Sequence, residues 1–110
     1  MDKSLEMKKL TQDDLSNDQM LIDQGQLIRI HIGSAITSVD IIQHSDEEAK
    51  KKYDFLPELI EKLRKYALAL NIWRLGKLSD QDKENLWHEI ESVQKEIQPL
   101  LKKVKTVEGN

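Results

Sequence analysis

His31 and the serines that follow it are the residues of this chain whose types and spacing could support covalent chemistry. Ser34 and Ser38 lie three and seven positions after His31, and a hydroxyl beside a base is the arrangement that nucleophilic catalysis requires. On a helix, however, such serines also serve as small residues at a helix contact, or bond back to the preceding turn. The chain has no cysteine, and its four glycines match neither a dinucleotide-binding nor a P-loop pattern. We therefore predict no catalytic residue and no enzymatic activity.

A second group with possible chemistry is Glu84, His88 and Glu91, which share one helix face at i, i+4 and i+7. A di-iron site in a helical bundle needs two Glu-x-x-His pairs, and the sequence contains none. We interpret the three residues as a surface row with weak side-chain pairing. The sequence thus predicts no metal site and no cofactor.

The segment His31-Ile32-Gly33-Ser34-Ala35 resembles the His-x-x-Lys-Gly-Ser-[Ala/Ser] signature of histidine phosphotransfer domains. The resemblance covers five of 110 residues, lacks the lysine and has a shorter His-to-Gly spacing. It implies a helical bundle of about this length in which His31, exposed in the middle of a helix, is phosphorylated. Two other interpretations stay open: a histidine at the edge of an apolar seam, and a pH-sensitive interface.

The element that must organise the chain is a helix over residues 56–75. One seam at 4-3-4-3 spacing comprises Leu59, Leu63, Tyr66, Leu70 and Trp73. A second stripe, on roughly the opposite face, comprises Leu68, Ile72 and Leu75. A helix half that is apolar nearly all round is expected to be buried on more than one side. Other helices of the chain, or a partner, must cover it.

The residues before this helix predict a long helix over residues 17–43 and a short one over about 46–54. Ser16 with Gln19 and Ser45 with Glu48 have the spacing of capping boxes. The first helix has a seam of Leu21, Ile28, Ile32, Ala35, Val39 and Ile42. Residues 26–33 also alternate like a strand, and helix-interior glycines at 25 and 33 are unfavourable; Gly33 could instead mark a kink or a close helix crossing. Whether residues 26–33 are helix or strand is open at this stage.

Pro57 favours a break near residues 54–57, a kinked continuous helix being the alternative. Gly76 is a natural helix end, and Ser79 with Asp82 opens a last helix. Its seam comprises Leu86, Ile90, Val93, Ile97, Leu100 and Val104. Pro99 is expected to kink or thin that helix in its last turns.

These segments predict an all-α fold: an antiparallel bundle of three long helices plus a short N-terminal helix or arm, because short links force neighbouring helices to run antiparallel. Residues 1–15 are expected to be a short, loosely docked helix or a disordered arm. Residues 16–106 form the bundle, and residues 107–110 a frayed tail. Either the N-terminal arm or a second copy of the chain could supply a fourth element.

Charge and hydropathy limit the classes of partner that the sequence predicts. The net charge is −3, and the lysines at 50–52 and at 102, 103 and 105 are interpreted as solvated helix faces without base-stacking aromatics. No nucleic-acid partner is therefore expected. No apolar run has the length of a signal sequence or a membrane span, so we expect a cytoplasmic protein with no membrane partner.

The function expected from the sequence is that of a non-enzymatic interaction module, such as a small regulator, adaptor, chaperone or inhibitor. Three helices of this length do not easily cover a helix that is apolar all round, so a homodimer, or a complex with another protein, is expected. The predicted contact residues are Leu68, Ile72, Leu75 and Trp87. The alternative is that the N-terminal segment covers both the stripe and Trp87.

Overall fold

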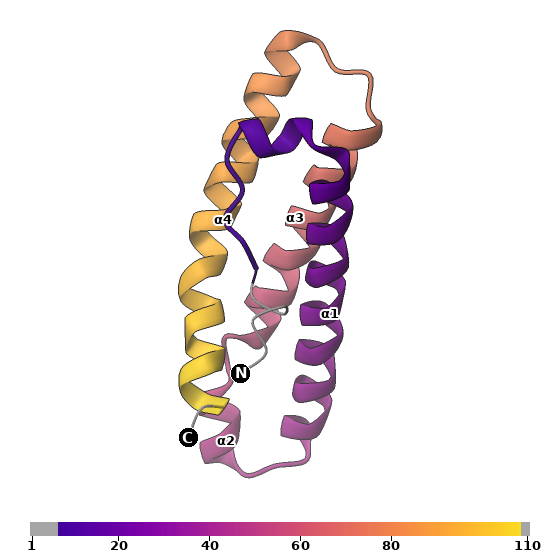
Figure 1. Ribbon diagram of the computed structural model, residues 1–110. Helices are drawn as coiled ribbons and strands as arrows, with labels where there is room; N and C mark the ends of the chain where they lie inside the picture. Colours follow the sequence, from indigo (N-terminus) through magenta and orange to yellow (C-terminus); the bar gives the residue numbers. More distant parts are fainter. Residues whose placement is uncertain (1–6, 109–110) are drawn as a thin grey trace.

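A computed structural model describes residues 7–108 and contains helices but no strand within that range (Figure 1). A short 3-10 helix, η2, is followed by four α-helices. Their bounds are η2 Asp13–Ser16, α1 Asp18–Gln43, α2 Glu47–Lys52, α3 Leu56–Leu75 and α4 Asp80–Glu108. The predicted all-α bundle of three long helices is confirmed.

The long helices α1, α3 and α4 run antiparallel to their sequence neighbours, and α3 packs against both of the others (Figure 1). The bundle is elongated, about 50 Å along its longest axis. Residues 7–16 run between α1 and α4, on the side where both helices meet α3. This N-terminal segment occupies the place of a fourth helix.

The core follows the predicted seams. Leu59, Leu63, Tyr66 and Leu70 of α3 are each at most 2% exposed, and Ile28 of α1 and Ile90 of α4 are fully buried. The α4 seam is buried from Leu86 to Leu100, and the α1 seam at Leu21, Ile28 and Ala35. Burying such aliphatic side chains is the main stabilising contribution to a bundle of this size.

The N-terminal segment is packed tightly, contrary to the expectation of a loosely docked helix or a disordered arm. Leu10 and Leu15 are each only 2% exposed and join the core. Thr11 donates its backbone N–H to Asp14 Oδ2 at 2.8 Å, and this hydrogen bond lowers the pKa of Asp14. The part of the expectation that concerns residues 1–6 lies outside the described residues.

A buried polar network holds this segment in place. The Tyr66 hydroxyl donates to Gln94 Oε1 at 2.8 Å and accepts from Gln24 Nε2 at 3.0 Å. Gln94 also bonds both backbone groups of Leu10, accepting from its N–H at 2.7 Å and donating to its carbonyl at 3.1 Å. Gln24 donates in addition to the carbonyl of Lys8 at 2.7 Å. Gln24 of α1 and Gln94 of α4 therefore fix the extended segment, and Tyr66 of α3 links the two glutamines.

Both capping predictions for the first two α-helices are wrong by one residue. Asn17, not Ser16, caps α1 by accepting from the N–H of Met20 at 3.2 Å. The Ser16 hydroxyl instead donates to the carbonyl of Asp13 at 2.7 Å. The reason is competition: a serine whose hydroxyl serves the preceding turn leaves the cap to the next residue.

The same shift occurs at α2. Asp46 caps this helix by accepting from the N–H of Ala49 at 2.9 Å. The Ser45 hydroxyl donates to the carbonyl of Ile41 at 3.1 Å, in the last turn of α1. The cap of α4 agrees with the prediction, because Ser79 Oγ accepts from the N–H of Asp82 at 3.1 Å.

The helix over residues 26–33 is continuous with the rest of α1, so the strand interpretation is wrong. The break at Pro57 is confirmed: α2 ends at Lys52 and α3 begins at Leu56, with the proline in its first turn. Pro99 does not end α4, which continues to Glu108. Since Pro99 is exposed, water can serve the carbonyl that loses its partner.

Two glycines in different surroundings give a paired stability test. An added Cβ at Gly33 would meet nothing within 4 Å, which excludes the close helix crossing suggested for this position. At Gly76, which ends α3, an added Cβ would lie 2.5 Å from the carbonyl oxygen of Ile72. Gly33 therefore carries only the backbone entropy cost of a helical glycine, whereas Gly76 is required by close approach.

We predict that Gly33→Ala raises the free energy of unfolding by about 0.5–1 kcal/mol, because alanine is the better helix former. Gly76→Ala is expected to lower it by at least about 1 kcal/mol, because the backbone must shift. Urea titration followed by circular dichroism measures both. A destabilised Gly33→Ala variant would show that this position has packing the structure does not contain.

Burial of Tyr66 generates a prediction about alkaline pH. Loss of solvation raises the pKa of Tyr66 from 10.0 to about 12, and only the bond from Gln24 acts against this. The folded protein therefore keeps the phenol proton over a range where the unfolded chain loses it. The stabilisation is complete below pH 10 and is lost as the pH rises to about 12.

Over that range we expect the free energy of unfolding to fall by about 2–3 kcal/mol on account of Tyr66. The Tyr66→Phe variant is expected to be less stable at neutral pH but to lack this part of the pH dependence. Urea titrations of both proteins at several alkaline pH values isolate the contribution of Tyr66 to the free energy of unfolding, because every other titrating group is common to both. Parallel pH profiles of the two proteins would contradict the assignment.

Candidate functional site

The second apolar stripe of α3 lies on the surface of the bundle. Leu68 is 60% exposed, Ile72 41% and Leu75 71%; we call these three residues the outer face of α3. They lie opposite the core seam, which faces α1 and α4. The expectation that the second half of α3 is buried on more than one side is therefore wrong within this chain.

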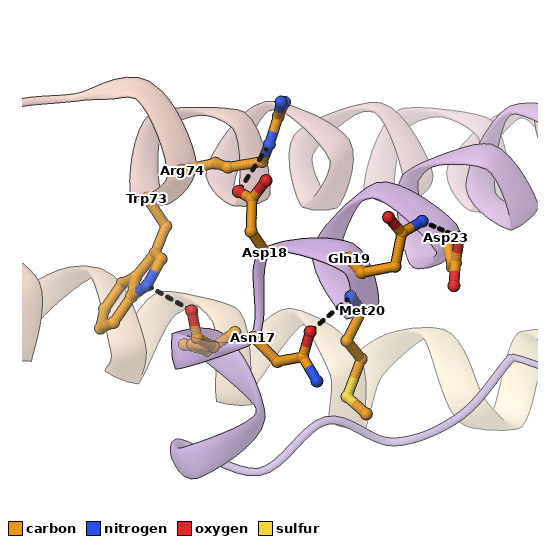
Figure 2. A network of polar contacts seen from close by, with 8 residues as sticks. Asn17, Asp18, Gln19, Met20, Asp23, Trp73 and Arg74 are labelled. Carbon is orange, nitrogen blue, oxygen red and sulfur yellow. Dashed lines mark hydrogen bonds and ion pairs between the residues drawn. The ribbon is translucent and has the colours of Figure 1, made fainter.

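The N-terminal segment does not cover this face, because it packs on the opposite side of α3. Trp73 donates its indole N–H to the backbone carbonyl of Leu15 at 3.0 Å, and Arg74 Nε donates to Asp18 Oδ1 at 2.9 Å. Figure 2 shows both side chains reaching toward η2 and the start of α1. Because successive helix residues are about 100° apart, Ile72 and Leu75 point elsewhere.

Trp73 is thus half-buried rather than fully in the core, and its position explains why. Its ring packs against the core while its N–H needs an acceptor. The Leu15 carbonyl is available because it lies in η2, a helix too short to use its own last carbonyls. The contact closes the end of the bundle between η2 and α3.

A groove between α1 and α3 opens beside the outer face. Its volume is about 240 Å³, and Gly25 and Arg29 of α1 and Ala67 and Asn71 of α3 are among the residues that line it. Asn71 follows Leu68 by one turn and precedes Leu75 by another, so the groove is continuous with the stripe. At Gly25 no side chain fills the groove, and an added Cβ would meet nothing within 4 Å.

The outer face differs from the exposed isoleucines of α1. Ile30, Ile36 and Ile41 are 50%, 43% and 62% exposed, but six and five positions separate them. Single exposed apolar residues of this kind are normal on a protein surface. Among the side chains whose exposure the structure describes, exposed large aliphatic residues fall on consecutive turns of one stripe only in α3.

Trp87 was predicted to share the contact surface. It lies on α4, is partly buried and packs against the core. Its ring therefore contributes to the bundle and leaves only part of its surface for a partner. Its place in an interface stays a prediction, whereas the outer face is continuous without it.

His31, Ser34 and Ser38 do come together, as lining residues of one small cavity with Tyr53. The cavity lies between α1, α3 and α4 and has a volume of about 30 Å³, which is room for about one water molecule. His31 is partly buried there. The resemblance to phosphotransfer domains implies an exposed histidine, and this one is recessed among helices.

Glu84, His88 and Glu91 form a row on α4, and its one close pair lies at the surface. His88 Nε2 lies 3.2 Å from Glu84 Oε1, and both side chains are more than half exposed. Within residues 7–108, no three histidine or carboxylate side chains are grouped so that they could hold a metal ion. In the same range, no helix has the length and apolar character needed to cross a membrane.

The fold and this surface define the protein as a small all-α bundle with an uncovered apolar helix face. Comparisons of the chain with protein-family models, with curated proteins and with solved structures found no match.

Proposed function

We propose that this protein is a non-enzymatic interaction module and that it associates with a second copy of itself through the outer face of α3. The observation that supports this is the exposure of Leu68, Ile72 and Leu75 on consecutive turns, at 60%, 41% and 71%. These side chains contribute little to the folded monomer. Their burial in a complex would instead stabilise that complex by removing apolar surface from water.

The size of that gain favours a second copy as the partner. Removing a leucine or isoleucine side chain from water contributes about 1.5–3 kcal/mol when burial is complete. A two-fold contact uses the same patch on both subunits, so each dimer buries the outer face twice. Six aliphatic side chains can then offset the loss of translational and rotational freedom that association costs.

Light scattering coupled to size-exclusion chromatography over a concentration series tests the proposal. We expect a dimer that dissociates on dilution. Leu68→Glu is expected to weaken association by at least about hundredfold, since each dimer carries the buried charge twice. Ile41→Glu is the matched control: Ile41 is 62% exposed on α1, so the same chemical change is expected to leave association unchanged.

Circular dichroism of both variants completes the test. Because Leu68 and Ile41 are both exposed in the monomer, neither substitution is expected to reduce helicity. A wild-type protein that is monomeric at every concentration would contradict self-association. Unfolding of Leu68→Glu alone would show that Leu68 belongs to the intramolecular core.

A further inference from the structure

Two groups of lysines that are far apart in sequence meet at the end of the bundle where α2 lies. Lys51 and Lys52, at the end of α2, and Lys102 and Lys103, near the end of α4, line a single hollow of about 450 Å³. We call this feature the lysine hollow. In the sequence these lysines read as two separate solvated faces, and only the packing of α4 beside α2 and the start of α3 brings them together.

The floor of the lysine hollow is apolar. Phe55 and Pro99 line it, and Phe55 is only 6% exposed. The Lys103 ammonium lies 5.4 Å from the centre of the Phe55 ring, within the range of a cation–π interaction. This contact holds one of the four ammonium groups over the hollow.

The charge balance of the hollow is strongly positive in a protein that is acidic overall. Four lysines line it, and Asp54 is the one acidic residue among its lining residues, while the net charge of the chain is −3. Like charges that converge on a concave surface repel one another and attract anions. A bound anionic group would relieve that repulsion.

We propose that the lysine hollow binds an acidic segment of another polypeptide, with its carboxylates on the lysines and an apolar side chain over Pro99, which is exposed. Charge complementarity and the apolar floor together favour this partner. Nucleic acid fits less well, since Phe55 is too buried for bases to stack on it and the basic surface is local rather than a stripe.

This site is distinct from the outer face of α3. Phe55 precedes the first residue of α3, and Leu68, the first residue of the outer face, lies 13 positions further along the chain, so about 20 Å of helix separates the two surfaces. The inference does not depend on the proposed self-association. A variant of one surface is therefore a fold control for the other.

Fluorescence anisotropy with a labelled acidic peptide tests the proposal. The probe is a peptide of about ten glutamates with one central leucine, long enough in extended form to cross the hollow. We expect saturable binding at low salt that weakens as salt rises. Lys51→Glu and Lys103→Glu are each expected to weaken binding by about tenfold or more, because each reverses one charge of the site.

The matched control is Lys83→Glu, an exposed lysine in the first turns of α4, at the other end of the bundle. It changes the net charge by the same amount and is expected to alter binding by no more than about twofold. Equal weakening by Lys83→Glu would show attraction by net charge alone and overturn the proposal. Two variants on different helices guard against a local folding defect, which circular dichroism would reveal.

Two further probes decide the class of partner. A single-stranded DNA of about ten nucleotides supplies phosphates along a flexible chain, and vesicles containing phosphatidylserine supply them at a surface. Tighter binding of either probe than of the peptide, lost in Lys51→Glu and Lys103→Glu, would overturn the assignment to an acidic polypeptide. Absence of peptide binding at low salt would also overturn it.

Discussion

The hydroxyl of Tyr66 and the two buried glutamines set the constraint on which the rest of the structure depends. Gln24 and Gln94 are each 3% exposed and Tyr66 is 1% exposed, and polar groups at such depth destabilise the fold unless they are hydrogen-bonded. Within the described chain, no buried side-chain nitrogen or oxygen lacks a partner. The backbone of Lys8 and Leu10 supplies the partners that the helices do not. The N-terminal segment is therefore required by the core it closes.

That requirement decides which side of α3 is left open. Because residues 7–16 must reach Gln24 and Gln94, they lie on the core side, between α1 and α4. Trp73 fastens the end of the segment through the Leu15 carbonyl, and Arg74 pairs with Asp18 at the start of α1. A different segment would be needed to cover the outer side of α3, and no segment within residues 7–108 lies there. The exposure of Leu68, Ile72 and Leu75 thus follows from where the polar groups of the core are satisfied. The exposed apolar stripe and the buried polar network on opposite sides of α3 therefore have one cause, the position of the N-terminal segment.

Much of the fold could be predicted because its signals are local. Pro57 and Gly76 bound α3 at the expected residues, and the seams of α1, α3 and α4 follow helix periodicity. The N-caps of α1 and α2 could not be predicted, since at each a serine and the residue after it compete for the same role and the outcome depends on the preceding turn. Gln24 and Gln94 are not predicted to be buried, because Gln24 interrupts the α1 seam and Gln94 flanks the α4 seam beside Val93, where an exposed glutamine is the ordinary expectation. The lysine hollow could not be predicted, because it forms only where the end of α2 lies near the end of α4, and helix periodicity does not predict how helices are placed relative to one another.

The two proposed binding surfaces rest mainly on side chains that the core does not need, the exception being Phe55, which is buried under the lysine hollow. Leu68 and Leu75 are more exposed than buried, and Lys51 and Lys52 lie on a helix with no buried residue. Stability resides instead in the seams and in the Tyr66 network, on the opposite side of α3. Substitutions on the two surfaces should therefore change association without changing the fold, and substitutions in the network should do the reverse.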